Sequence, residues 1–466
     1  MVSFSLPDIL VIISFFAVLL GVGFWAGRKK ETGAEGYLLS GRNVGLWVFI
    51  ATNVATWYGG ILGVGEFTYR YGLVSWFTQG FPYYIFAIIF GLFFAKKVRG
   101  ASLFTIPDKI EQTYGKLAGQ LSAILIFILV SPAPYLLMAA NLLSLIFNLS
   151  LITSLLITLV ISSIYLFRGG YKSYLYTDVL QFFIMFAGFI IIVAVSFYKY
   201  GGIGFLQSNL PKDHLTLSGG NSPAFIIVWF LIALWTFTDP GFHQRCYAAK
   251  DGSTASKGII ISVFFWLIFD FLTTATGMFS RAVIPGIENP VLAFPVYAEK
   301  VLGPGLKGIF YAALFATIIS TLNSFFFLSA TTLGRDFIEK NMKVKDDAKL
   351  TRYTRYGLVI SSLIAFVICL YFDSVIAIWY TVGSICIPGI IFLITGAYFE
   401  RFRVGKRTAV IELITGVGVS LIWFLLREEI DHASILIEIE PMIVGLLAAL
   451  AVHLVGLRRE KKILTD

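Results

Sequence analysis

The stretch Ala51-Thr-Asn-Val-Ala-Thr-Trp-Tyr-Gly-Gly60 decides the fold, because it interrupts a long apolar segment with polar side chains and two adjacent glycines. A second apolar segment is interrupted by Trp235-Thr-Phe-Thr-Asp-Pro-Gly241, where the proline cannot continue the hydrogen bonding of a helix. Within hydrocarbon, backbone groups freed by such a break must face protein or line a cavity. A pair of broken helices therefore points to a central binding site between them.

The composition identifies a polytopic membrane protein. Of the 466 residues 58% are hydrophobic and 14% are charged, and the mean hydropathy is +0.83. These values exceed those of soluble domains. We count about thirteen apolar stretches long enough to cross about 30 Å of hydrocarbon, at residues 8–27, 44–71, 75–98, 118–147, 151–167, 174–199, 223–249, 256–281, 305–334, 353–372, 376–399, 408–426 and 440–457. The stretch 118–147 contains two prolines, so we expect it to be kinked or to begin with a short surface helix, and we count it as one span.

The positions of the two breaks predict an inverted repeat. They fall in the second and seventh spans, which are five spans apart. Because five is an odd number, these two spans must cross the membrane in opposite directions. We expect an all-α single membrane transport domain over residues 1–466, with 8–27 as an extra N-terminal span, 44–199 and 223–399 as two five-span repeats, and 408–457 as two C-terminal spans. Matched broken helices are typical of secondary transporters.

The charge pattern predicts an orientation. An external amino terminus and a cytoplasmic carboxyl terminus place most of the 36 Lys and Arg residues on the cytoplasmic side, as the positive-inside rule requires. The net charge of +9 is then a topology signal. It does not indicate a nucleic-acid partner, since the charges are spread over short loops. We expect an integral protein of a bacterial-type plasma membrane, with no obligatory protein partner.

A stripe of hydroxyl groups lies in the ninth span. Offsets of three and four residues place four hydroxyls on one helical face, with an amide beside them; these residues are Thr317, Ser320, Thr321, Ser324 and Asn323. Oxygen ligands of this kind suit a monovalent cation such as Na⁺, particularly if carbonyls from the break in the second span complete the shell. Serine and threonine side chains also hydrogen-bond the backbone of their own helix. Four such residues on one helical face are more than this local bonding usually explains.

Ionisable residues inside spans are functional candidates, because a charge in hydrocarbon is costly. Asp178, Asp239 and Asp270 are such residues, and each can carry a proton. Glu66 and Arg70 lie one helical turn apart, so we interpret them as a mutual structural pair.

The sequence carries no catalytic constellation. The four histidines are scattered, the three cysteines have no paired spacing, and no phosphate loop or nucleophile motif is present. We therefore do not expect an enzyme.

The chain resembles the sodium:solute symporter family over nearly its whole length. The resemblance rests on motifs that occur in the family's order, namely Leu39-Ser-Gly-Arg42, Thr177-Asp178-Val179, Gln244-Arg245, Ala248-Ala249-Lys250 and Ser320-Thr321. It implies the leucine-transporter fold. It also implies a sodium site made of carbonyls at Ala51, Val54 and Thr317 and hydroxyls at Ser320 and Thr321. Some relatives have a second sodium site, which implies ligands at Asp178, Ser320, Asn323 and Ser324, although Asn323 stands where those relatives have serine.

Part of the chain is similar to the high-affinity choline transporter branch of this family, in the stretches Ala55-Thr-Trp-Tyr-Gly-Gly60, Gly91-Leu-Phe-Phe-Ala-Lys96 and Tyr114-Gly-Lys116. That branch holds its quaternary amine in an aromatic cage. Trp57 and Tyr83 match cage positions, whereas Asp239 and Ala133 stand where the cage has Trp, which speaks against choline itself.

Three interpretations of the residues near the breaks remain open. Trp57, Tyr83 and Trp235 can hold an organic cation against their rings, with Asp239 as its counter-charge. The same rings can stack on a sugar or polyol whose hydroxyls bond Asp239, Asn53 and Thr236. Asp239 can instead only cap the helix that begins at Pro240.

We therefore expect a sodium-coupled symporter that imports a small organic solute, cationic or zwitterionic, by alternating access. A sodium-coupled sugar, polyol or carboxylate symporter and a proton-coupled transporter are the alternatives. A channel or a sensor is a remote one.

Overall fold

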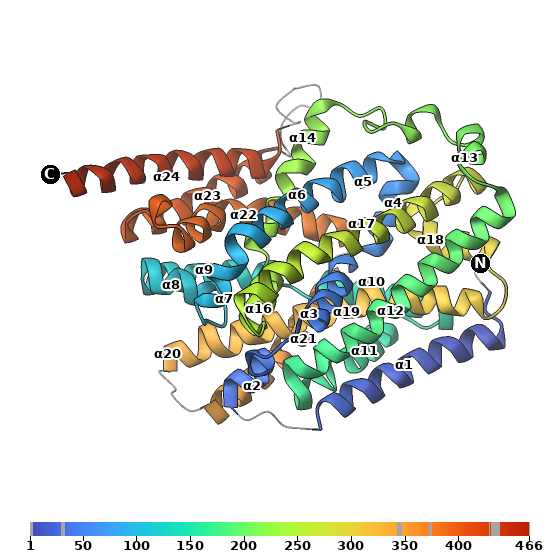
Figure 1. Ribbon diagram of the computed structural model, residues 1–466, viewed down its shortest axis with the longest axis horizontal. Coiled ribbons are helices and arrows are strands. Elements are labelled where there is room, and N and C mark those ends of the chain that lie inside the picture. Colours follow the sequence, from blue (N-terminus) through green and yellow to red (C-terminus); the bar gives the residue numbers. More distant parts are fainter. Residues whose placement is uncertain are drawn as a thin grey trace.

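The computed structural model describes residues 3–28, 33–342, 347–371, 375–427, 429 and 439–465. Over these ranges the chain is helical without a strand, apart from a single bridge between Val44 and Ala249. The all-α expectation is confirmed. Figure 1 shows the long helices running in similar directions, with the two termini at opposite ends of the bundle.

Each of the thirteen predicted stretches falls on a helix or a helix pair. Eleven helices in the described ranges are long and apolar enough to cross a membrane; these are Leu6–Ala26, Val74–Gly100, Lys116–Phe147, Leu166–Tyr200, Phe225–Ala248, Gly252–Val283, Leu306–Glu339, Lys349–Tyr371, Thr381–Tyr398, Lys406–Arg427 and Pro441–Glu460. A bent pair, Leu46–Tyr58 with Ile61–Tyr71, makes a twelfth. The remaining stretch is the shorter apolar helix α11, Leu151–Ser163.

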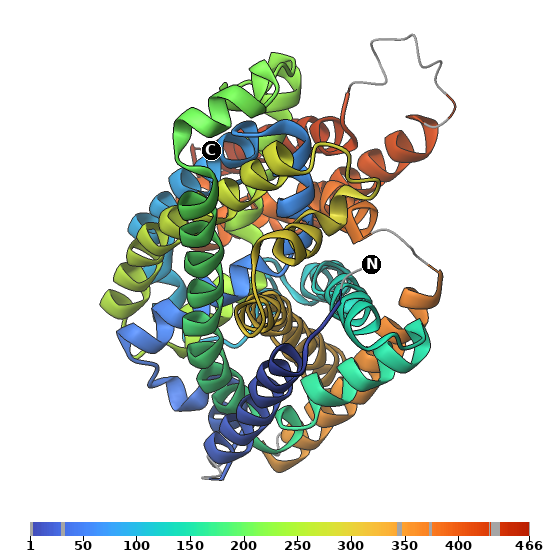
Figure 2. The same cartoon turned by 90° about the vertical axis from the view of Figure 1, so that its right-hand side faces the viewer.

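Helix α19 (Leu306–Thr331) forms the centre of the bundle, where Figure 2 shows it end-on. In the span that contains α19, 89% of an 18-residue apolar segment is buried inside the protein. The corresponding value for α1 (Leu6–Ala26) is 28%. Helices α12 (Leu166–Tyr200), α1 and α21 (Asp347–Tyr371) pack around α19. A polar stripe on this helix is therefore shielded from lipid.

The predicted break in the second span is present. Helix α3 (Leu46–Ala55) passes into the three-residue 3₁₀ helix η2 (Thr56–Tyr58), and α4 (Ile61–Tyr71) resumes at an angle of 58°. Gly59 lies in the gap and allows α19 to approach, because a Cβ on Gly59 would lie 2.5 Å from Thr321 Cβ. Gly59 is therefore required by the close packing of α19 against this break.

The predicted break in the seventh span is present too, but its shape differs. The span consists of α14 (Pro223–Ile232), α15 (Trp235–Thr238) and α16 (Pro240–Ala248). Asp239 has extended backbone angles and separates the last two helices. Among the described helix pairs that together are long and apolar enough to cross a membrane, the pair in the second span is the one bent by more than 40°.

The kink expected from the two prolines in the fourth span is also found. Helix α9 ends at Leu129 and α10 begins at Ala133, with Ser131 and Pro132 in the gap. The two helices form one span, Lys116–Phe147.

Candidate functional site

The structure joins one of the five predicted sodium residues, Thr321 of α19, to the broken second span. All five are buried, Val54, Thr317 and Ser320 completely so and Ala51 and Thr321 almost so. The Thr321 hydroxyl donates to the Thr56 carbonyl at 2.8 Å and to the Thr317 carbonyl at 3.2 Å. Hydroxyl oxygens of α19 and carbonyl oxygens of η2 therefore share one buried space, which has the ligand chemistry that Na⁺ requires.

Asp178 joins this junction from α12. Its carboxylate accepts a hydrogen bond from Ser320 at 2.7 Å and another from Thr52 of α3. The carboxylate is fully buried, and it links three helices that the sequence separates by more than one hundred residues. Ser320 thus belongs to both predicted sodium sites.

The other two residues predicted for a second sodium site are turned to tyrosines. Asn323 donates its amide hydrogen to the Tyr165 hydroxyl, while its Oδ1 is buried without a partner among the described groups. Ser324 hydrogen-bonds the Tyr174 hydroxyl. An acceptor oxygen of Asn323 is therefore left without a partner among the described groups.

Sequence reasoning missed Arg245, which lies in the same region. This side chain is 4% exposed, and its Nη2 donates to the hydroxyls of Thr56 and Tyr174. The guanidinium acts electrostatically on both Asp178 and Asp239. The rule that marks ionisable residues within spans would have found it, since Arg245 falls inside the predicted span 223–249.

Aromatic rings gather beside η2. The Trp57 ring lies 4.9 Å from Tyr83, 5.6 Å from Phe242 and 4.8 Å from Trp266 between centroids. Phe242 and Trp266 stack at an interplanar angle of 10°. The structure therefore brings together Trp57 and Tyr83, as predicted, and adds Phe242 and Trp266, which were not predicted because they lie far away in sequence.

Polar groups without partners border these rings. Asn53 lies one turn before Trp57, so both point to one side of the helix. Asn53 is 1% exposed, and neither Oδ1 nor Nδ2 has a hydrogen-bond partner in the described part of the chain; the indole N–H of Trp266 is also unpaired there. Because an unpaired buried polar group costs about 1–3 kcal/mol, these atoms indicate a place for a polar ligand.

Asp239 is an N-cap in this structure. Its Oδ1 accepts from the Phe242 amide at 2.7 Å, and its Oδ2 accepts from the Trp235 indole N–H at 3.1 Å. Helix α15 packs against α6 (Phe81–Ile89), the helix that carries Tyr83, and Asp239 acts electrostatically on Tyr83. Asp239 therefore caps α16, and whether it also meets a solute stays a prediction.

The pair interpreted as structural is indeed a pair, because Arg70 Nε lies 3.0 Å from Glu66 Oε1. No group of three His, Cys, Asp or Glu side chains in the described ranges is arranged to hold a metal ion. The ion chemistry of the junction therefore rests on hydroxyl, carbonyl and single carboxylate oxygens.

An ion-pair cluster joins α8 (Ile106–Tyr114), which lies outside the membrane spans, to the end of the span Leu306–Glu339. Asp108 contacts Arg335 at 3.0 Å and Lys340 at 2.9 Å, and Lys340 also contacts Glu111 at 2.7 Å. Burial by itself raises the pKa of Asp108, but Arg335 and Lys340 together hold that pKa below its ordinary value. The cluster therefore stabilises the fold above the ordinary carboxyl pKa, and this contribution is lost as the pH falls through the lowered one.

Comparison with known proteins agrees with this geometry. The model of the sodium:solute symporter family matches residues 37–416. The chain is 27% identical to the sodium/glucose cotransporter of Vibrio parahaemolyticus, over 78% of this chain and 74% of that one. It is 27% identical to the sodium/pantothenate symporter of Escherichia coli (strain K12), over 97% of each chain.

A shorter match, 35% identical over 191 residues, links it to the high-affinity choline transporter 1 of Drosophila melanogaster, over 40% of this chain and 31% of that one. The structure of a Na⁺-coupled sialic acid symporter in a substrate-bound outward-open state superposes with a TM-score of 0.83 over 98% of each chain, at 14% identity. That likeness shows a shared fold.

Proposed function

The chain belongs to the sodium:solute symporter family, in which solute transport is coupled to sodium, and we propose that it imports a small zwitterionic organic solute by alternating access. The observation that carries this proposal is the buried junction where Thr321 of α19 bonds the Thr56 carbonyl of the broken second span. One ion bound there contacts both parts of the protein whose relative movement alternating access requires.

We place the sodium ion between η2 and α19. Its ligands are the carbonyl oxygens of Ala51, Val54 and Thr317 and the hydroxyl oxygens of Ser320 and Thr321. Thr321 bonds two carbonyls in this structure, and on ion binding direct coordination of its hydroxyl would replace these bonds. Sodium therefore stabilises one arrangement of the second span relative to α19.

A second sodium ion belongs beside Asp178, with Ser320, Asn323 and Ser324 as further ligands. The free Oδ1 of Asn323 supports this placement, since an amide oxygen can replace a hydroxyl as a sodium ligand. Arg245 opposes it, because a buried guanidinium already acts on Asp178. The opposing charges of Asp178 and Arg245 set whether the protein carries one sodium ion or two per cycle.

The solute site lies between the breaks and comprises Asn53, Trp57, Tyr83, Trp235 and Asp239. An ammonium group fits between the aromatic faces and the Asp239 carboxylate. A carboxylate on the same solute fits the unpaired amide of Asn53 and the unpaired indole N–H of Trp266. A zwitterion satisfies both ends of this site, whereas a simple quaternary amine leaves the Asn53 and Trp266 groups unpaired.

The relatives are transporters, and transport needs no reacting side chain at this site. Sodium binding and solute binding are coupled because both involve η2. Sodium orders η2, and η2 carries Trp57, which contacts the solute. By linkage, the solute must tighten sodium binding by the same factor as sodium tightens solute binding. We also propose an external amino terminus and a cytoplasmic carboxyl terminus, on the charge distribution of the loops.

A thermal-shift screen of the purified protein tests the proposal. Amines, amino acids, sugars and carboxylates are each added in sodium and in potassium, because a ligand of the folded state raises its melting temperature. Stabilisation by amino acids or betaines only in sodium supports a zwitterion symporter. A sugar or polyol response redirects the substrate assignment, and stabilisation that is indifferent to sodium contradicts the coupling.

A further inference from the structure

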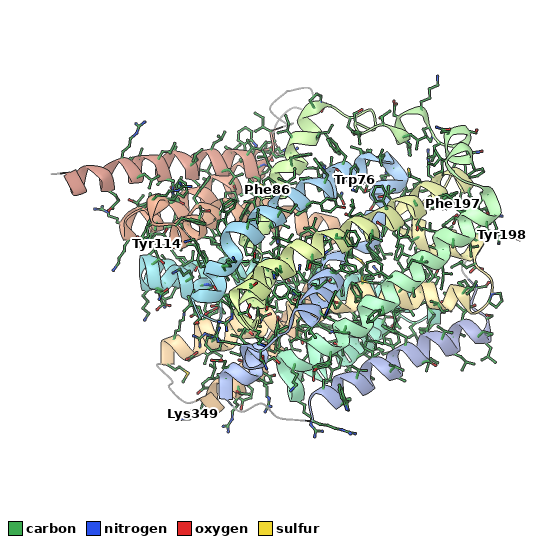
Figure 3. The ribbon with its side chains drawn as sticks, viewed as in Figure 1. Trp76, Phe86, Tyr114, Phe197, Tyr198 and Lys349 are labelled. Atoms are coloured by element: carbon green, nitrogen blue, oxygen red, sulfur yellow. The ribbon has the colours of Figure 1, made fainter. Side chains whose placement is uncertain are left out.

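A chain of hydrogen bonds converges on Asp270, a buried carboxyl group of α17 (Gly252–Val283) to which the symport mechanism above gives no role. Tyr84 of α6 donates to Asp270 Oδ2, and the Tyr84 hydroxyl receives the indole N–H of Trp76 at 3.2 Å. On the other side, the Tyr58 hydroxyl lies 2.9 Å from Asp270 Oδ1 and 3.0 Å from the Trp266 carbonyl. Trp76 is labelled in Figure 3, where α5 (Val74–Gln79) runs along α17.

Counting the hydrogens in this chain favours a hydrogen on Asp270. The Tyr58 hydroxyl has one hydrogen, and the Trp266 carbonyl can only accept one. With an ionised Asp270, Oδ1 and the Trp266 carbonyl must share that single hydrogen, so neither receives a full hydrogen bond. With a hydrogen on Asp270 Oδ1, every contact is satisfied in a single direction, from Trp76 through Tyr84, Asp270 and Tyr58 to the Trp266 carbonyl.

We propose that Asp270 is a proton-binding site that holds a proton in this conformation and couples proton binding to sodium binding through Tyr58. The proton sits on Oδ1 and is donated to the Tyr58 oxygen. When the proton leaves, Oδ1 becomes an acceptor, the Tyr58 hydrogen turns to it, and the bond from Tyr58 to the Trp266 carbonyl is lost.

Burial favours the neutral form of the Asp270 carboxyl, while hydrogen bonds donated by Tyr84 and Tyr58 favour its ionised form. Tyr58 and Tyr84 are the only side chains whose bonds act on it in the described ranges, and no cationic group does so. Ionisable side chains on neighbouring elements are engaged elsewhere. On α4, Glu66 and Arg70 pair with each other. Arg245 of α16 bonds Thr56 and Tyr174, and Asp178 of α12 accepts from Ser320. On α7 (Ala95–Gly100) Arg99 bonds the Ala249 carbonyl, and on α18 (Ala293–Val301) Glu299 pairs with Lys307. An unpaired negative charge at membrane depth would be costly.

Tyr58 connects this carboxyl to the sodium junction. It ends η2, the three-residue helix that begins with Thr56, and the Thr56 carbonyl accepts the Thr321 hydroxyl. The next residue, Gly59, packs directly against Thr321. A change in the anchoring of Tyr58 therefore reaches Thr56, two residues away, whose carbonyl bonds the proposed sodium ligand Thr321. The sodium affinity thus depends on the proton at Asp270.

Infrared spectroscopy of the purified full-length protein in lipid nanodiscs tests the proton directly. A protonated carboxyl gives a C=O stretching band that an ionised one lacks, and Asp270→Asn removes only the band of this residue. The asparagine can donate to Tyr58 and accept from Tyr84, so this variant retains the chain of bonds. We expect the wild-type spectrum at neutral pH, minus that of Asp270→Asn, to contain the band. A difference spectrum without it at neutral pH means an ionised Asp270 and overturns the proposal.

Sodium titration at several pH values tests the coupling, which rests on the proposed sodium symport. The probe is sodium chloride against potassium chloride, and thermal stability is followed between about pH 6 and pH 9. We expect the half-saturating sodium concentration of the wild type to rise with pH by at least about fivefold, and that of Asp270→Asn to stay constant. Tyr58→Phe, which breaks the link but keeps the carboxyl, should also show constant sodium affinity.

The outcomes separate the two hypotheses. A protein that binds no sodium at any pH contradicts the symport mechanism, while the infrared band still decides the protonation of Asp270. Sodium binding with the same pH dependence in the wild type and in Asp270→Asn contradicts the coupling. Sodium binding that tightens as the pH rises points to proton competition at Asp178, and this also contradicts it.

Discussion

The two broken spans solve the same problem in opposite ways. In the seventh span the freed groups are satisfied within the break itself, because Asp239 caps α16 and also accepts from Trp235. In the second span no side chain caps α4, the helix bends by 58°, and the Asn53 amide remains unpaired in the described part of the chain. The Thr56 carbonyl there is bonded from another helix, by Thr321.

This difference indicates a division of labour. A break that is satisfied internally has little to gain from a ligand, so the seventh span serves as a wall of the site. A break that depends on α19 for its hydrogen bonds changes its state when an ion enters that junction. We infer that the second span is the element that responds to sodium, and four substitutions test this asymmetry.

Adding a methyl group to each break should have the largest effect and the clearest contrast. In Gly59→Ala the new Cβ would lie 2.5 Å from Thr321 Cβ, and in Gly241→Ala it would lie 2.7 Å from the end of the flexible Arg245 side chain. Overpacking costs about 1–3 kcal/mol where neighbours cannot move. We expect Gly59→Ala to weaken sodium binding by about a hundredfold and Gly241→Ala to weaken it far less, as measured by sodium-dependent thermal stability. Equal losses would contradict the asymmetry.

Removing the unpaired amide in the second span should separate stability from binding. Asn53→Ala deletes two buried polar atoms without partners, so the free protein should melt no lower than the wild type. Solute binding should weaken by about thirtyfold, since about 2 kcal/mol of hydrogen bonding to the solute is lost. Thr236→Ala in the seventh span is the matched control, because its hydroxyl already bonds the Ala233 carbonyl at 2.9 Å. Binding is measured by calorimetry with the solute found in the screen.

Loss of one proposed sodium ligand should have a smaller effect. Thr321→Ala removes a single oxygen, and we expect the half-saturating sodium concentration to rise about tenfold. Thr331→Ala on the same helix serves as the control, because that hydroxyl bonds only the Phe327 carbonyl, at 2.8 Å. Sodium-dependent uptake into proteoliposomes gives the measurement. An unchanged sodium dependence in Thr321→Ala, or in the double variant with Ser320→Ala, would remove the site from the junction.

The fold could be predicted from the sequence because a membrane requires each span to be a long apolar segment. Apolar length marks each span, and glycines, proline and aspartate mark the two breaks, so both breaks were located to the residue range in which the structure places them. The stripe on α19 was also predictable, since its period is that of a helix. The length of α11 was overestimated, because hydropathy continues past Ser163 where the helix ends.

Contacts between distant helices could not be predicted in this way. Arg245 meets Thr56 and Tyr174, and Asp270 meets Tyr58 and Tyr84, only through the rotation of each helix about its axis. A single sequence shows which face of a helix is polar. It does not show which other helix that face packs against, or which side of that helix it meets. For the same reason, the stacking of Phe242 and Trp266 beside Trp57 was not foreseen, although Trp57 itself was.

The smallest effect on sodium binding should come from Asp239, while its effect on solute uptake decides what the seventh span contributes. Asp239→Ala removes the cap of α16 and should lower the stability by about 1 kcal/mol. Asp239→Asn keeps an oxygen for the Phe242 amide but loses the negative charge. If the seventh span is only a wall, Asp239→Asn transports like the wild type and only Asp239→Ala melts earlier. If the carboxylate meets an ammonium group of the solute, Asp239→Asn melts like the wild type yet no longer takes up the solute. Uptake and melting curves of the two variants, measured side by side, therefore show whether the internally satisfied break also holds the solute, which would narrow the contrast between the two spans.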